Sequence, residues 1–175
     1  MDRFVVIGEV VKAVGLKGEF KLYPLLDFHP DLLDSGYLAW SDDTPVQVQR
    51  HRPAGSCEVV KAAGIADRNG AEAVVGRELG FRSADYLEPD FPRPPGGLPF
   101  RYLDRPVVTT EGRSVGNVVE VRFTGGGFML VVSDPAGSAG EILIPAVAPI
   151  LQPDEGLTGQ LVIDPPEGLL DVQSG

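Results

Sequence analysis

The sequence predicts an all-β protein built from two small domains, and three features of the chain point to this fold. The 22 glycines and 16 prolines among 175 residues interrupt the chain often, which favours short strands and turns over long helices. Short apolar or alternating runs recur in both halves. A segment rich in proline and glycine then separates the two halves.

The first half predicts a series of strands with one short helix. Residues 4–14 are apolar and β-branched, and residues 19–23 and 45–50 alternate with the period of two that marks a half-buried strand. Residues 79–82 are expected to form a closing strand. The predicted helix has a cap at Asp67, an end at Gly76 or Gly80, and a buried face made of Val74, Val75 and Leu79.

The second half predicts five further strands, at 107–108, 114–123, 128–132, 142–144 and 161–163. Residues 110–113 and 125–127 between them are typical of hairpin turns. Short strands at regular spacing indicate a closed or nearly closed barrel. Residues 83–98 contain four prolines and two glycines, which neither a helix nor a central strand tolerates. We therefore predict domains at 1–82 and 99–175, joined by a linker at 83–98.

The charge of the chain is uneven. The net charge of −10 argues against non-specific nucleic-acid binding, which needs cations to neutralise phosphates. Residues 1–82 hold 10 Lys and Arg against 12 Asp and Glu, whereas residues 99–175 hold 4 against 10, a net charge of −6. An acidic second half suits a basic partner, although solubility alone also explains it and is the interpretation that charge by itself favours.

Several function classes find no support in the sequence. Cys57 is the single cysteine, so no internal disulfide is possible, and we expect it to be a buried small side chain. Two histidines and one cysteine make a structural zinc site improbable, and we expect no metal and no cofactor. The G-x-S-x-G motif and the phosphate-binding loop motif are both absent, and no apolar run is long enough to span a bilayer. We therefore expect a cytoplasmic protein that binds partners and is not an enzyme.

Three segments are candidates for binding, and each has a plainer interpretation. The loop 15–19 can present Leu16 and Lys17 to a partner, or it can be an ordinary turn, which is the more frequent case. Residues 100–103 (Phe100, Arg101, Tyr102 and Leu103) have the composition of a protein interface, but the residues alone favour the plainer interpretation, in which Phe100 and Tyr102 belong to the core of the first barrel strand. A basic patch is formed by Lys12, Lys17, Lys21, Arg50, His51 and Arg52. It can contact an RNA backbone, or it can merely form a solvated strand end, and the two interpretations have equal weight.

Taken in order, these segments resemble the RimM family of ribosome maturation factors. The similarity is carried by residues 10–22, 27–30, 64–68 leading to 76–79, 111–118, 142–147 and 164–170. The resemblance implies an N-terminal barrel like those of translation factors and a C-terminal PRC barrel. It also implies a monomeric, non-enzymatic assembly factor that binds the small-subunit precursor (pre-30S) through protein nineteen of its head domain and supports 16S rRNA processing. The alternative is a regulatory or small-molecule-binding PRC module, against which the translation-factor-like first half argues.

The sequence departs from the family pattern at three places. Val14 stands where the family usually has a histidine before the first loop glycine. The aromatic pair before the second barrel is reduced to Phe100 and Tyr102 around Arg101, and residues 105–107 replace a more apolar segment that contains glycine.

Overall fold

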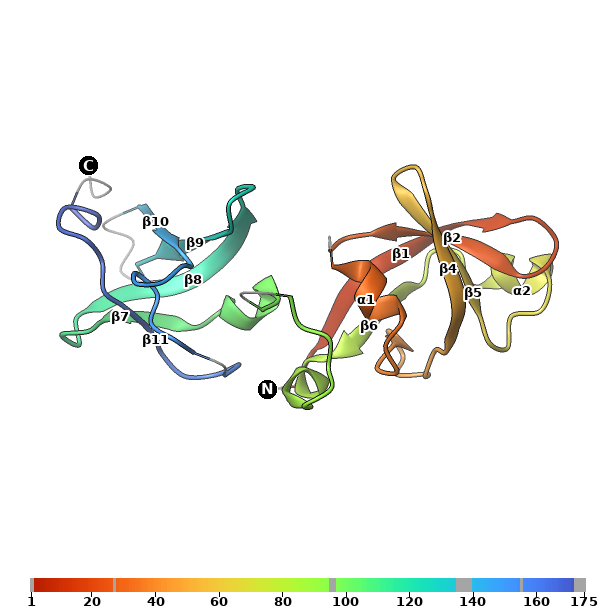
Figure 1. Ribbon diagram of the computed structural model, residues 1–175, viewed down its shortest axis with the longest axis horizontal. Coiled ribbons are helices and arrows are strands. Elements are labelled where there is room, and N and C mark those ends of the chain that lie inside the picture. Colours follow the sequence, from red (N-terminus) through yellow and green to blue (C-terminus); the bar gives the residue numbers. More distant parts are fainter. Residues whose placement is uncertain (1, 27, 95–96, 135–139, 155, 172–175) are drawn as a thin grey trace. The chain divides into compact units, whose positions relative to one another are not determined.

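A computed structural model describes residues 2–26, 28–94, 97–134, 140–154 and 156–171. Most of the regular structure is β-strand, as the sequence predicts, and the chain forms two compact units, Met1–Pro92 and Arg93–Gly175 (Figure 1). Asp27 of the motif at 27–30 and residues 95–96 of the predicted linker lie outside the described residues. None of the described helices is long and apolar enough to cross a membrane.

The first unit is a curled antiparallel sheet with the strand order β3-β6-β1-β2-β5-β4 (Figure 1). Its strands are β1 (Phe4–Val14), β2 (Glu19–Pro24), β3 (Ala39–Trp40), β4 (Val48–Ala54), β5 (Cys57–Ala62) and β6 (Glu78–Arg82). Side chains that alternate toward the inner face fill the barrel, and those of Ile7, Phe20, Leu22, Val60 and Phe81 are fully buried.

The segment between β3 and β4 brings the two edges of this sheet together. The Trp40 amide donates to the Thr44 carbonyl, and the Val46 amide donates to the Leu38 carbonyl, both over 2.9 Å. The next residue, Gln47, accepts from the Ala63 amide at the end of β5, also over 2.9 Å. The strand predicted at 45–50 therefore begins only at Val48, because Pro45 and Val46 pair with residues at the opposite edge, in and just before β3.

The helices of the first unit are short. The predicted one is α2 (Arg68–Ala73), and Asp67 caps it by accepting from the Gly70 amide over 2.9 Å, as the sequence indicates. The prediction of which side chains form the buried face of α2 was wrong in part. Val74 is buried, but Val75 is exposed because the helix has already ended, and Leu79 belongs to β6. No sequence pattern indicated α1 (His29–Leu33), which buries Leu32 and Leu33.

Residues that follow β6 pack onto the first unit. After η1, a 3-10 helix at Ser83–Leu87, the ring of Phe91 lies 4.9 Å from Phe81 and 5.6 Å from Tyr86. All three rings are buried. The exact extent of the linker at 83–98 stays a prediction. Cys57 is only half-buried, in contrast to the expectation, because its side chain lies on the outer face of β5.

The second unit is a five-stranded sheet with the order β10-β9-β8-β7-β11. Its strands are β7 (Pro106–Thr109), β8 (Ser114–Phe123), β9 (Phe128–Ser133), β10 (Glu141–Pro145) and β11 (Leu161–Ile163), which confirms all five predicted strands. β11 runs parallel to β7, and the remaining pairs are antiparallel. Beyond β11 the sheet continues to residues 150–152, because the Gln152 amide donates to Val162 and the Asp164 amide to Ile150.

Candidate functional site

The loop between β1 and β2 presents an apolar side chain to solvent. Gly15 and Gly18 have φ values of +62° and +84°, so the reversal uses the left-handed backbone conformation expected at both glycines. Between them, Leu16 is 79% exposed and Lys17 is exposed as well. An aliphatic side chain this accessible contributes little to folding and is available to a partner.

Two cations fasten this loop to the segment that connects β5 with α2. The ammonium group of Lys61 donates to the Lys17 carbonyl over 2.7 Å and also to the Ile65 carbonyl. The guanidinium of Arg68 donates to the Gly15 carbonyl over 3.1 Å. The loop is thus held by charge-assisted hydrogen bonds, which limit its conformational freedom.

A basic face covers the outside of four neighbouring strands of the first unit. The strand register places Lys12 opposite Lys21, Lys21 opposite Val59, and Val59 opposite Arg52. Inward-facing residues such as Phe20 alternate with these, so the four side chains of this row share the outer face. The sequence-predicted patch is therefore brought together, with two exceptions: Lys17 lies in the loop, and His51 points inward.

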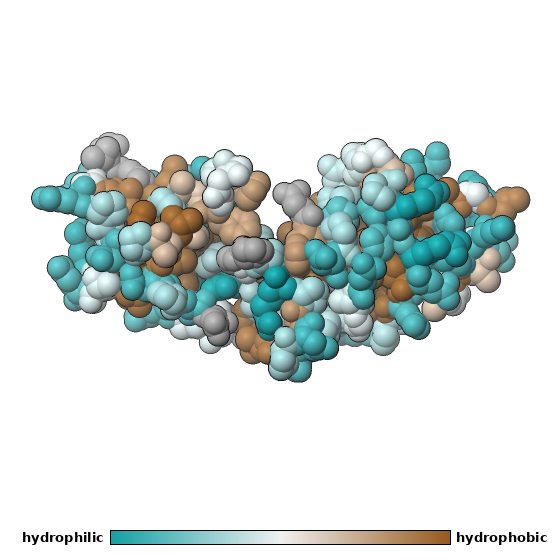
Figure 2. All heavy atoms as spheres, viewed as in Figure 1, coloured by the Kyte–Doolittle hydropathy of each residue, from teal (hydrophilic) through white to brown (hydrophobic). Residues whose placement is uncertain are grey.

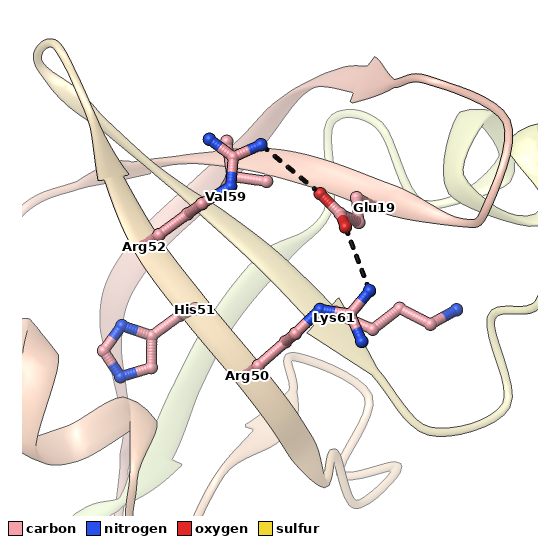
Figure 3. A pocket seen from close by; sticks show the side chains of 6 residues that line it. All are labelled: Glu19, Arg50, His51, Arg52, Val59 and Lys61. Carbon is pink, nitrogen blue, oxygen red and sulfur yellow. Dashed lines mark hydrogen bonds and ion pairs between the residues drawn. The ribbon is translucent and has the colours of Figure 1, made fainter.

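Glu19 holds two arginines of this face beside each other (Figure 3). One carboxylate oxygen lies 3.1 Å from Nη2 of Arg50, and the other lies 3.6 Å from Nη2 of Arg52. The two guanidinium groups border a shallow hollow, which is lined by Glu19, Arg50, His51, Arg52, Val59 and Lys61. Both arginine side chains remain 62% exposed, so their other N–H groups are accessible to an anion.

On the other side of β4, a buried carboxylate sits between two imidazoles. Glu58 is 3% exposed, and its oxygens lie 2.6 Å from Nδ1 of His51 and 3.3 Å from Nε2 of His29. The second ring nitrogen of His51 lies 3.1 Å from Asp34, at the end of α1. Burial lowers the pKa of His51, but the hydrogen bonds to Glu58 and Asp34 outweigh it, so that its pKa is raised.

In the second unit, the predicted interface segment forms η2 (Pro99–Tyr102), a 3-10 helix, instead of a strand. Phe100 and Tyr102 are both buried, and Tyr102 belongs to the core of this unit. Arg101 lies over the Tyr102 ring, 4.9 Å from its centre, and like Leu103 it is half-buried. The structure thus brings the four residues into one turn, in which both aromatic side chains are buried and that of Tyr102 packs into the barrel core.

Sequence reasoning missed a buried arginine directly after this turn. Arg105 is 3% exposed and forms a bidentate ion pair with Asp154, with Nη1 2.7 Å from Oδ2 and Nη2 3.0 Å from Oδ1. Its remaining donors bind the carbonyls of Gly156, Thr158 and Gly159. This arginine therefore fixes the loop before β11.

An apolar surface lies at the hairpin between β8 and β9. Phe123 is 62% exposed, and its ring stands edge-on to Phe128, 5.9 Å away. Val147 and Leu143 are also exposed, and Figure 2 shows hydrophobic side chains gathered over the β9 and β10 region of this unit. Nothing in the sequence singled out this surface, because its residues come from separate strands.

Within the described part of the chain, no group of three or more His, Cys, Asp or Glu side chains has an arrangement that would hold a metal ion. The described residues present three accessible surfaces: the β1–β2 loop held by Lys61 and Arg68, the basic face of the first unit, and the β8–β9 hairpin with the exposed ring of Phe123.

Comparison with family models gives two matches in chain order. Residues 5–85 match the RimM N-terminal domain, and residues 102–169 match the RimM PRC barrel domain. Together the two matches cover most of the chain.

Two curated relatives of similar length agree with these matches. Ribosome maturation factor RimM from Anaeromyxobacter dehalogenans is 35% identical over 173 residues, covering 94% of this chain and 96% of the relative. The protein of the same name from Synechococcus sp. (strain RCC307) is 34% identical, covering 97% and 98% of the two chains. The solution structure of the N-terminal domain of RimM from Thermus thermophilus covers 50% of this chain and 96% of that chain at 29% identity, with a TM-score of 0.41.

Proposed function

The chain belongs to the RimM family, and from this premise we propose that it is a non-enzymatic assembly factor of the small ribosomal subunit. In this proposal it binds the subunit precursor through small-subunit protein nineteen, a basic protein of the head domain, and thereby supports 16S rRNA processing. It acts as a monomer.

One observation carries the proposal. Both family domains occur in order over nearly the whole chain, and relatives of equal length bear the name ribosome maturation factor. A stand-alone regulatory PRC module would not include the N-terminal domain matched at residues 5–85.

The charge distribution supports a basic protein partner for the second unit. Residues 99–175 carry the net charge of −6, and opposite charge speeds the encounter of two macromolecules. The exposed ring of Phe123 beside Phe128 supplies the apolar contact area that interfaces need at their centre. Phe100 and Tyr102 act in this proposal by shaping the turn that holds Arg101 and Leu103 in place.

The fastened loop of the first unit supplies a second contact. Leu16 and Lys17 stand at its tip, and the hydrogen bonds from Lys61 and Arg68 reduce the loss of loop freedom on binding.

The proposal is tested by titrating the purified head protein into the full chain by calorimetry over a range of salt concentrations. We expect binding that weakens as salt rises, since charge attraction is screened. Leu16→Ala should weaken it at least fivefold, about 1 kcal/mol, as for a buried interface anchor. Leu25→Ala is the matched control, because Leu25 is also exposed but follows the opposite end of β2. Absence of binding at every salt concentration would overturn the partner assignment.

A further inference from the structure

We propose that the basic face of the first unit binds an unpaired strand of RNA, with phosphates against its cations and one base stacked on Tyr23. The inference rests on the proposed function, because it identifies a second class of ligand for the same assembly factor. The basic face is defined by Lys12, Lys21, Arg50 and Arg52.

The cations lie as a continuous surface across β1, β2, β5 and β4. Lys12, Lys21 and Arg52 belong to one row of the sheet. Arg50 lies on the same face of β4, two residues before Arg52. Neighbouring strands are about 4.8 Å apart, so the row spans roughly 14 Å, enough for more than one phosphate of an extended strand. A chain with a net charge of −10 thus concentrates cations on one side of one unit.

Glu19 organises the two arginines without using up their donors. Its carboxylate lies between the two guanidinium groups and contacts Nη2 of each, at 3.1 Å for Arg50 and 3.6 Å for Arg52 (Figure 3). Each guanidinium keeps N–H donors that Glu19 does not use, and a guanidinium binds a phosphate through two parallel hydrogen bonds. Lys61 does not belong to this binding set, because the carbonyls of Lys17 and Ile65 already accept hydrogen bonds from its ammonium group.

Tyr23 adds an aromatic ring to this surface. It lies two residues beyond Lys21 on β2, so it points to the same face, and it is 48% exposed. A solvent-exposed tyrosine on an open sheet, two residues from Lys21 and opposite Glu9 of β1, provides a platform on which an unstacked base can lie. A duplex keeps its bases inside the helix and would not use this ring.

The same charges argue against a protein partner at this face. The partner proposed for the acidic second unit is basic, and four cations would repel it. RNA phosphates are attracted instead, and the two units can then bind different components of one assembling particle.

The experiment measures fluorescence anisotropy of a labelled, unstructured 12-nucleotide RNA, and of the same strand in a duplex, with the full chain. We expect the single strand to bind more tightly than the duplex. Arg52→Gln should weaken binding several-fold and reduce the slope of log K against log salt by about one. Tyr23→Ala should weaken it about tenfold, whereas Tyr23→Phe should retain it. Arg113→Gln, a matched charge change at an exposed turn of the second unit, should have little effect.

Equal binding of duplex and single strand, equal binding by wild type and variants, or no RNA binding would each overturn the inference. The head-protein titration is run with the same variants. If Arg52→Gln and Tyr23→Ala abolish that binding and RNA is not bound, the face is a protein interface and the proposed function stands. If RNA binds as expected and the head protein does not, the partner assignment fails and the inference stands.

Discussion

At the scale of single residues, the most constrained side chain of the second unit is Arg105. Every nitrogen of its guanidinium donates a hydrogen bond, and Asp154 accepts through both carboxylate oxygens. Burial tends to raise the pKa of Asp154, but Arg105 and Arg101 more than compensate and lower it. The pair therefore stays charged at neutral pH.

Replacing Arg105 is expected to destabilise the second unit strongly. Arg105→Met leaves the Asp154 carboxylate and the carbonyls of the following loop without their main donor, at a cost of about 3 kcal/mol in the free energy of unfolding. Urea denaturation followed by circular dichroism measures it. Arg113→Met, at an exposed position, should change stability by less than about 0.5 kcal/mol. Similar values for the two variants would show that the network is not stabilising.

Sequence alone could find the loop at Leu16, because two glycines three residues apart define a tight reversal. It could not find the partner of Arg105, since Asp154 lies 49 residues away and no local pattern links them. The residues alone favoured core positions for Phe100 and Tyr102, and both are buried, but they lie in η2 and not in the expected strand, which no local pattern indicated.

At the scale of elements, the β1–β2 loop shows why its two glycines are not equivalent. A Cβ at Gly15 would meet open space, whereas a Cβ at Gly18 would overlap the Ile65 carbonyl and approach the Lys61 ammonium to 2.9 Å. Both have positive φ, so the backbone strain of a substitution is common to both.

The two glycines therefore give a matched pair of variants. Gly15→Ala should cost about 1 kcal/mol from strain alone. Gly18→Ala should cost at least about 2 kcal/mol more, because it also displaces the carbonyl that Lys61 binds. Thermal and urea unfolding of the two variants, side by side, measures the difference; equal costs would mean that the loop is not fastened as described.

The contact of α1 with the β4–β5 hairpin is expected to depend on pH. Because the pKa of His51 is raised in the folded state, its contribution to stability is complete below the unfolded pKa of about 6.5. It is lost as pH rises through the folded pKa. Between pH 6 and 9 the wild type should therefore lose more stability than His51→Gln, in urea unfolding at each pH. If the free energy of unfolding changes with pH to the same extent in both proteins, this role of His51 is excluded.

Element prediction succeeded where local pattern and tertiary pairing agree. The strands of the second unit alternate or carry β-branched residues between clear turns, and all five were found. β3 has only two residues, so no periodicity could reveal it. The start of β4 was misplaced because Pro45 and Val46 alternate like the start of a strand but pair with Ala39 and Leu38 at the other edge of the sheet.

At the scale of the whole molecule, the two units carry different surfaces. The first bears a fastened apolar loop and a basic sheet face, and the second is acidic and exposes an aromatic hairpin. This division suits a protein that contacts both a basic protein and an anionic nucleic acid, and it explains how a chain of net charge −10 can take part in ribosome assembly.

The most direct test of the account is the ribosome profile of a strain that lacks this protein, measured by sucrose-gradient sedimentation. The account predicts an excess of free small subunits that contain unprocessed 16S rRNA precursor, corrected by the wild-type protein and less well by a chain with both Leu16→Ala and Arg52→Gln. A profile and a precursor level identical to those of the parent strain would contradict it.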